Sequence, residues 1–197
     1  MTRYFYDTEF LEDGSTIELI SIGIVAEDGR EYYAVNAEMP MDRIRKHDWL
    51  VRNVLPHLPL TSRTSLDKYL GNPPNSFPRP PIDFVGLDRA TTCVKPRQVI
   101  ANEVRDFLLA GVSKPELWAW YGAYDHVVLC QLWGRMIDLP KGVPMWTNDL
   151  RQEVHRLGDP QPPEQLGGEH NALEDARHLK AMHQYLQHIR EVLDTDT

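Results

Sequence analysis

Cysteine is scarce in this 197-residue chain, and long apolar runs are lacking. The two cysteines, Cys93 and Cys130, give neither a disulfide framework nor a metal-binding spacing, which predicts a reducing, cytoplasmic setting. The longest apolar runs, such as ELISIGIVA, are too short to span a bilayer, so we expect no membrane segment. The opening MTRYFYDTEF enters a strand directly, without the basic, apolar and small-residue regions of a secretory signal.

A basic excess is also missing, since the net charge of −8 argues against a protein that coats nucleic acid non-specifically. The charge is unevenly spread: the balance is −7 over residues 1–40, +5 over 41–105 and −6 over 106–197. The middle third is therefore the one region positive enough to attract a phosphate backbone, although chance clustering on a solvated surface explains it nearly as well. The length suits a single domain spanning residues 1–197.

Hydrophobic periodicity and turn residues predict an α/β fold, with three antiparallel strands followed by alternating helices and strands. The expected strands lie within residues 3–10, 16–28, 30–39, 117–121 and 144–150. Two helices are expected within residues 41–58 and 95–110. Three more are expected to begin at Ala123 or Asp125, after Asp149, and at Ala172, the last ending at about Val192. The apolar side of the 41–58 helix is expected at Ile44, Trp49, Leu50 and Val54. Residues 70–83, rich in Pro and Asn, predict an extended surface loop.

Two carboxylates occupy the first predicted strand, where apolar side chains would be expected. Asp7 and Glu9 are two residues apart, so both project from one face beside Phe5. Two buried anions side by side need a cation between them, and a divalent metal with oxygen ligands is the usual solution. A strand end emerging into solvent, with both carboxylates hydrated, is an equally good interpretation of this segment alone.

Two predicted helices each direct a carboxylate toward the sheet. The stripe of Leu129, Leu132 and Met136, continued backwards by four residues, reaches Asp125. The stripe of Leu179, Met182 and Leu186 reaches Asp175 in the same way. Asp125 could simply be a helix N-cap. For Asp175 that explanation is weaker, because Asn171 and Glu174 already resemble a capping pair and leave Asp175 without a structural duty.

His170 is five residues before Asp175, a spacing that would turn it away from the carboxylate on a continuous helix. If the helix begins after Asn171, His170 lies on the preceding loop and can approach the same site. Gly167 and Gly168 would allow that loop to move.

Three segments, DTE at 7–9, GAYD at 122–125 and HNALEDA at 170–176, resemble in order and spacing the exonuclease motifs of the DEDDh 3′-5′ exonucleases. That superfamily includes ribonuclease T, oligoribonuclease and the proofreading subunit of bacterial DNA polymerase III. Tyr121 stands where many members carry Asn, four residues before the aspartate. The opening, the overall size and a basic Pro-rich insertion at about 57–96 are most similar to the actinobacterial polyadenylate-specific exoribonuclease AS group.

The resemblance implies a ribonuclease H-like mixed sheet and a two-metal mechanism. Asp7, Glu9, Asp125 and Asp175 would hold two Mg²⁺ or Mn²⁺ ions about 4 Å apart, and His170 would take the proton from the attacking water. The product would be a nucleoside 5′-monophosphate released from a single-stranded 3′ end or overhang of RNA. The resemblance further implies that Phe10 and Leu11 contact the terminal base and sugar, and that the protein forms a homo-oligomer. Phe10 as a core residue is the alternative.

Other functions use the same motifs. The same site could act on DNA, or on oligoribonucleotides and dinucleotides, because nothing in the motifs reports on the 2′-hydroxyl. A protein that binds RNA as a scaffold without turnover is a non-enzymatic alternative, disfavoured because all four carboxylates and the histidine are present. Candidates for phosphate contacts are Arg43, Arg45, Lys46, Arg52, Arg63, Arg79, Arg89 and Arg97.

Overall fold

A mixed six-stranded sheet forms the centre of the protein. The computed structural model describes residues 1–73, 82, 85–111 and 113–195. The strands are β1 Thr2–Glu12, β2 Ile17–Ala26, β3 Glu31–Asn36, β4 Val94–Lys95, β5 Pro115–Ala119 and β6 Asn148–Asp149, in the sheet order β4-β3-β2-β1-β5-β6. β1, β2 and β3 are antiparallel, whereas β4, β5 and β6 each run parallel to the neighbouring strand. The predicted fold class, three antiparallel strands extended by parallel ones, is confirmed.

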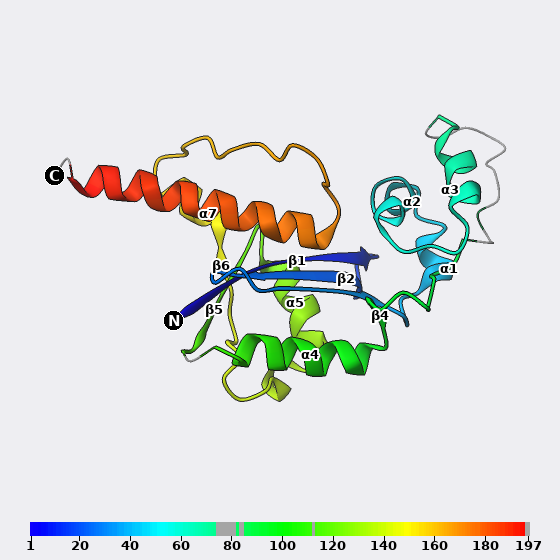
Figure 1. The fold of residues 1–197 in the computed structure, drawn as a ribbon, viewed down its shortest axis with the longest axis horizontal. Coiled ribbons are helices and arrows are strands. Elements are labelled where there is room, and N and C mark those ends of the chain that lie inside the picture. The colour runs from blue at the N-terminus through cyan, green and yellow to red at the C-terminus, as the bar shows by residue number, and fades with distance from the viewer. Residues whose placement is uncertain (74–81, 83–84, 112, 196–197) are drawn as a thin grey trace.

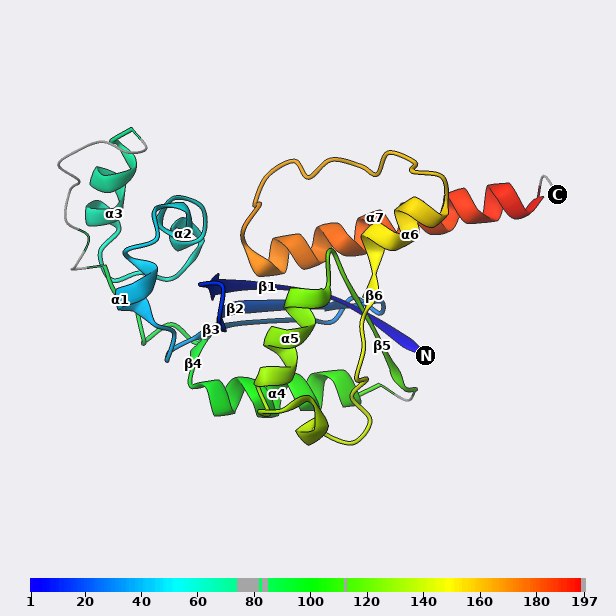
Figure 2. The ribbon, with the colours of Figure 1, turned by 180° about the vertical axis from the view of Figure 1, so that it is seen from behind.

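Helices cover both faces of the sheet (Figures 1 and 2). They are α1 Met41–Ile44, α2 Asp48–Asn53, α3 Arg63–Leu70, α4 Arg97–Leu109, α5 Ala123–Gln131, α6 Leu150–Arg156 and α7 Ala172–Thr195, with 3-10 turns η1 Leu55–His57 and η2 Met136–Asp138. Helices α4 and α5 lie on one face, and α7 lies on the other. The predicted start of a helix after Asp149 is confirmed, since the Asp149 side chain accepts a hydrogen bond from the backbone N–H of Arg151 at 2.9 Å.

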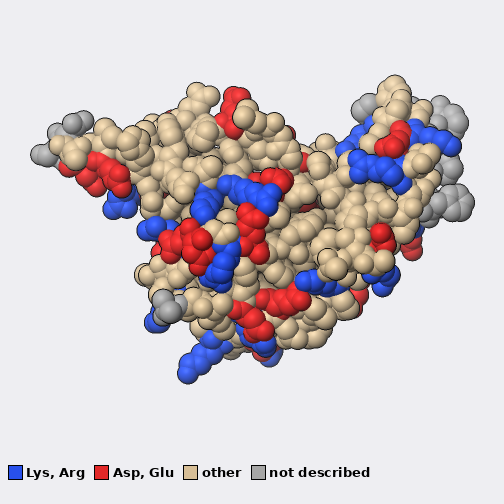
Figure 3. Space-filling view, in the orientation of Figure 1, with Lys and Arg blue, Asp and Glu red and all other residues tan. Residues whose placement is uncertain are grey.

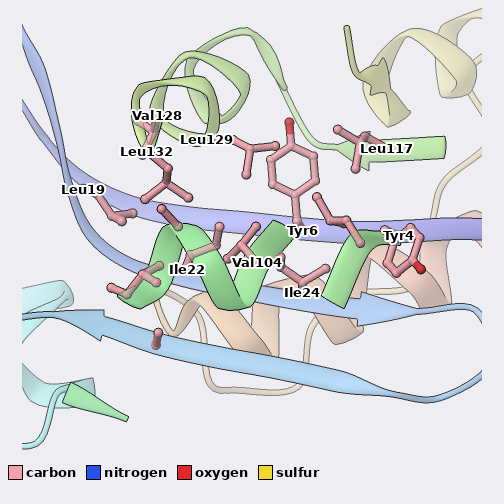
Figure 4. Close-up of a cluster of buried hydrophobic side chains, with 14 of the residues drawn as sticks. Tyr4, Tyr6, Leu19, Ile22, Ile24, Val104, Leu117, Val128, Leu129 and Leu132 are labelled. Atoms are coloured by element: carbon pink, nitrogen blue, oxygen red, sulfur yellow. The ribbon is translucent and has the colours of Figure 1, made fainter. Parts of the chain in front are cut away.

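The alternation of side chains along β1 supplies a different core on each face. Tyr4 and Tyr6 join Ile22 and Ile24 of β2 against α4 and α5, as Figure 4 shows. Phe5 points the other way and packs under α6 and α7. Since each fully buried side chain of this size stabilises the fold by roughly 1.5–3 kcal/mol, burial on both faces fixes the register of β1.

A helical lobe, residues 41–72, lies beyond the carboxyl end of β1 (Figure 1). The single helix predicted over 41–58 is wrong, because the chain breaks into α1, α2 and η1. His47 is extended (φ −99°, ψ 96°) and its ring accepts from the N–H of Leu50, so it starts a new helix. The lobe has its own apolar core, which includes Leu50 and Val54. Trp49, expected on that apolar side, is instead 47% exposed.

Two further sequence expectations need correction or fall outside the structure. Met136 does not continue the buried stripe of α5, because that helix ends at Gln131 and Met136 is exposed. α3 was not predicted from the sequence. Most of the loop predicted over 70–83 lies outside the described residues.

Candidate active site

The first two carboxylates lie on the face of β1 that α7 covers. Asp7 is partly buried and Glu9 is only 7% exposed, so a hydrated strand end is the wrong interpretation for Glu9. β5 pairs with β1 only as far as Phe5 and ends at Ala119. Asp7 and Glu9 therefore follow the point where the parallel neighbour stops, and the sheet edge leaves space for other chain segments.

The start of α7 brings Asp175 and His170 to these carboxylates. Glu9, His170 and Asp175 each offer one ligand atom, and these atoms lie within 4.8 Å of one another. The carboxylate of Asp175 accepts hydrogen bonds from the backbone N–H of His170 (2.9 Å) and from Nε2 of Gln165 (2.7 Å). Asp175 therefore also has a structural role that the sequence did not indicate, because its hydrogen bonds hold the 165–170 loop against α7.

His170 lies on the loop before α7, as expected if the helix begins after Asn171. Its backbone is in the left-handed region (φ 64°), which bends the chain just before the helix. The Asn171 side chain accepts from the N–H groups of Leu173 and Glu174 and so caps the helix. Glu174 does not complete the expected capping pair, since it binds Arg177 instead.

Asp125 reaches the site from the first turn of α5. It is not the N-cap, which is Gly122. Instead, its Oδ1 accepts two hydrogen bonds from Thr8, one from the backbone N–H at 2.9 Å and one from the hydroxyl at 2.7 Å. Thr8 lies between Asp7 and Glu9 in the sequence, so this pair of bonds anchors Asp125 to the acidic stretch of β1.

Burial raises the pKa values of all four carboxyl groups, and for Asp7 and Glu9 the charges of the other carboxylates add to it. The pKa of Asp7 is raised well above its usual value by burial and then by Asp125, Glu9 and Asp175. Burial followed by the charges of Asp175 and Asp125 raises the pKa of Glu9 to about 8. Burial also raises the pKa of Asp125 to about 6 and that of Asp175, although both accept hydrogen bonds that act in the opposite direction. Such a cluster favours bound protons or a bound cation.

A pH dependence follows from these shifts. Between pH 6.5 and 8 the folded, metal-free protein holds a proton on Glu9 that the unfolded chain, with a pKa near 4.5, has lost. Metal-free protein should therefore melt at lower temperature as the pH rises through this range, measured by thermal unfolding in a chelator. Glu9→Gln should flatten the dependence, and Mn²⁺ should stabilise the protein most at pH 8. If the melting temperature of the metal-free wild-type protein rose from pH 6.5 to 8 while that of Glu9→Gln did not, the expectation would be contradicted.

A cavity of about 560 Å³ opens beside the acidic cluster. It is lined by Asp7, Trp120, Glu164, Gln165, Glu169, His170, Asp175, His178, Leu179 and Met182. Its walls thus combine the carboxylates and His170 with the apolar side of α7, so the site is open to a ligand.

Residues that the sequence reasoning missed come from the helical lobe and from β2. The ring of Trp49 meets the ring of His170 edge-on, with centroids 4.8 Å apart. Gly23 is opposite Asp7 in the β1–β2 register, and the backbone of Ala172 passes so close that a Cβ at position 23 would lie 2.2 Å from its carbonyl oxygen. An isolated glycine inside a strand indicates such an approach, so this residue had a readable signal. Trp49 had none, because its helix pattern placed it in the core.

The two predicted substrate residues lie on opposite sides of β1. Phe10 is partly buried against the α4/α5 core and stacks on Tyr124, with centroids 6.1 Å apart and an interplanar angle of 9°. Leu11 is 4% exposed in the core of the helical lobe. Tyr124 is 57% exposed, so the Phe10–Tyr124 pair has one face open to solvent.

In this mixed sheet, the central strand β1 extends beyond its parallel neighbour β5, and the carboxylates gather at that point. The arrangement is consistent with a ribonuclease H-like protein whose acidic cluster could hold a metal ion. Residues 88–187 match the family described as the 3′-5′ exoribonuclease Rv2179c-like domain. The chain is similar to the 3′-5′ exoribonucleases MT2234.1 and Rv2179c of Mycobacterium tuberculosis strains CDC 1551 / Oshkosh and H37Rv. Each is 47% identical over 176 residues, which cover 89% of this chain and 87% of the relative.

The chain therefore belongs to the Rv2179c-like 3′-5′ exoribonuclease family. This membership confirms the enzyme class expected from the sequence. Among the helices in the described part of the chain, none has the length and apolar character needed to cross a membrane.

Proposed function

We propose that this protein is a two-metal-dependent DEDDh exoribonuclease that removes nucleoside 5′-monophosphates from single-stranded 3′ ends or overhangs of RNA. The observation that carries the proposal is the convergence of Glu9, His170 and Asp175 within 4.8 Å, in a chain of an exoribonuclease family. Asp7 and Asp125 complete the acidic set, because Asp125 raises the pKa values of both Asp7 and Glu9, and Glu9 and Asp175 also raise that of Asp7.

The donor set fits divalent cations. All four acidic residues supply hard oxygen ligands, and their raised pKa values show that the protein alone does not neutralise their charge. Asp7, Glu9, Asp125 and Asp175 would hold two Mg²⁺ or Mn²⁺ ions. Bound there, the cations would activate a water molecule and stabilise the leaving 3′ oxygen.

The protein's own groups orient the reacting parts. Thr8 fixes Asp125 with two hydrogen bonds, and Gln165 fixes Asp175. His170, held at the cavity wall by its backbone bond to Asp175, would accept the proton of the attacking water. The contact with Trp49 limits the positions that the imidazole ring can take.

Substrate would approach between the acidic cluster and the helical lobe. Figure 3 shows Lys and Arg gathered on the visible face of the lobe, and a hollow between the lobe and the rest of the molecule. Within the described residues, Arg43, Arg52 and Arg63 are paired with acidic side chains, which reduces their availability to phosphates. We propose Phe10 as a contact for the terminal nucleotide, with Trp49 as a further one, whereas Leu11, predicted beside Phe10, is buried in the core of the lobe and offers little surface to a ligand.

Trp49→Ala should lower kcat/KM on short single-stranded RNA. Loss of an exposed aromatic surface beside His170 is expected to cost about 1–3 kcal/mol in transition-state binding if a base stacks there. Steady-state kinetics would measure the loss. Trp146→Ala is the matched control, since Trp146 is 67% exposed and precedes β6. Equal kinetics for Trp49→Ala and wild type would remove Trp49 from the site.

A time course on 5′-labelled RNAs with blunt, overhanging and single-stranded 3′ ends, in Mg²⁺ and in Mn²⁺, tests the proposal. We expect a ladder that shrinks by one nucleotide and requires the cation. Faster cleavage of matched DNA would favour an exodeoxyribonuclease, and exclusive cleavage of the shortest oligomers would favour an oligoribonucleotide or dinucleotide phosphodiesterase. Binding without cleavage in either cation would favour a scaffold.

We also propose that residues 1–197 form one exonuclease domain, in which residues 57–72 of the basic Pro-rich insertion at about 57–96 belong to the helical lobe. A homo-oligomer and a cytoplasmic location stay predictions. Light scattering on the purified protein would measure the oligomeric state.

A further inference from the structure

In the part of the chain that the structure describes, Glu9 lacks the hydrogen-bond donors that Asp125 and Asp175 have. Asp125 accepts two hydrogen bonds from Thr8, and Asp175 accepts one each from Gln165 and His170. Among the hydrogen bonds between described residues, none is donated to Glu9, which is only 7% exposed. A buried carboxylate without a donor is costly and free to rotate, so a group that orients it should lie nearby.

Ser21 is directly opposite Glu9 in the antiparallel β1–β2 pair. Residues paired in this way project from the same face of the sheet with their Cβ atoms about 4.5–5.5 Å apart. Ser21 is 1% exposed, and its Oγ is a buried atom without a hydrogen-bond partner in the described part of the chain. Within the described residues, the Ser21 hydroxyl, which has no acceptor, thus lies opposite the Glu9 carboxylate, which has no donor.

Tyr33 supplies a second hydroxyl at the same place. Tyr33 lies on β3 opposite Gly23 of β2, so it is diagonal to Ser21 and on the same face of the sheet. The Tyr33 hydroxyl is also buried with no partner among the described residues. Burial and then the neighbouring Cys93 raise the pKa of Tyr33 to about 12, while the Ser21 hydroxyl lowers it and the charge of Glu9 raises it, so Tyr33 lies near both of these groups.

We propose that Ser21 and Tyr33 are positioning residues, whose hydroxyls donate hydrogen bonds that orient the Glu9 carboxylate toward a bound divalent cation. Each buried hydroxyl left unpaired costs about 1–3 kcal/mol, so orphan hydroxyls at a structural position would be unfavourable. Partners of metal ligands fix ligand geometry, and their loss lowers metal affinity about 10–100-fold. This inference rests on the proposed function, because it assumes a cation at Glu9.

Ser21→Ala tests the inference by direct metal binding. We expect the affinity for Mn²⁺, measured by calorimetry on the full chain, to fall at least about tenfold. The melting temperature of the metal-free protein should stay constant or rise, because an unsatisfied buried hydroxyl is removed. Ser21→Thr keeps a hydroxyl and should retain most of the affinity.

Tyr33→Phe removes the second hydroxyl and should also weaken Mn²⁺ binding. Its matched control is Tyr32→Phe on the opposite side of β3, where the hydroxyl donates to Oε2 of Glu103 at 3.0 Å, and this variant should bind Mn²⁺ as wild type does. Ser21→Ala and Tyr33→Phe combined should lose less than the sum of the two single losses, since both act through Glu9.

The outcomes separate this inference from the proposed function. If wild type binds Mn²⁺ but Ser21→Ala and Tyr33→Phe bind it equally well, the positioning role is overturned and the metal site stands. A lower metal-free melting temperature with unchanged Mn²⁺ affinity would assign Ser21 a structural role only. If wild type binds no Mn²⁺, the proposed function fails and this inference fails with it.

Discussion

Asp175→Asn should abolish release of nucleotides from 3′-labelled RNA while leaving the fold intact. Asp175 lies within 4.8 Å of both Glu9 and His170, and an amide there supplies one weak oxygen ligand in place of a charged carboxylate. Loss of a partner of a metal ligand already costs about 10–100-fold, so loss of a ligand should exceed about a hundredfold in kcat. Nucleotide release at saturating Mn²⁺ would measure the effect.

The control for this variant is one residue away. Glu174→Gln changes a carboxylate on the same turn of α7, but Glu174 points to Arg177 on the surface, so its activity should match wild type. The unfolding free energy of metal-free Asp175→Asn should not fall below that of wild type by more than the contribution of one hydrogen bond to the 165–170 loop, about 0.5–1.5 kcal/mol. Undiminished activity of Asp175→Asn would overturn the proposed mechanism.

Gly23→Ala should damage both the fold and the site. The new Cβ would lie 2.2 Å from the carbonyl oxygen of Ala172 and 2.4 Å from the backbone nitrogen of Leu173, and neither backbone atom can move without shifting the first turn of α7. Overpacking of this kind costs about 1–3 kcal/mol or more in unfolding free energy. Because Asp175 lies on the displaced turn, activity should fall further than the lost stability explains.

Denaturant unfolding and RNA cleavage on the same preparation separate these two effects. Gly86→Ala is the matched control, since among the described residues a Cβ at Gly86 meets only the Thr61 hydroxyl, at an ordinary 3.5 Å. It should fold and cleave as wild type does. A Gly23→Ala protein with wild-type stability and activity would show that α7 is not held against β2 at this point.

The periodicity of the sequence predicted the sheet and its two covered faces because burial alone sets these features. Tyr4 and Tyr6 alternate with Phe5, and this period of two places each residue in a different core. The same alternation places Asp7 and Glu9 on one face of the sheet. The stripe of α7 likewise located Asp175, because a helix that buries Leu179 and Met182 must turn its first-turn carboxylate toward the sheet.

The helical lobe shows where such reasoning fails. The pattern over 41–58 fits one amphipathic helix, but His47 starts a new helix, and the change of direction turns Trp49 out of the core and onto His170. Local periodicity cannot register that change, since it depends on how the lobe packs against the end of β1.

The sequence by itself determined the fold class and the faces of the sheet and predicted the residues proposed to carry the chemistry, because these depend on side-chain charge and on periods of two and 3.6 residues. Only the tertiary structure decided that Thr8 holds Asp125, that Gly23 admits the start of α7 and that Ser21 stands opposite Glu9. The physical reason is that these contacts join segments distant in the sequence, at a register and a separation that no local pattern specifies.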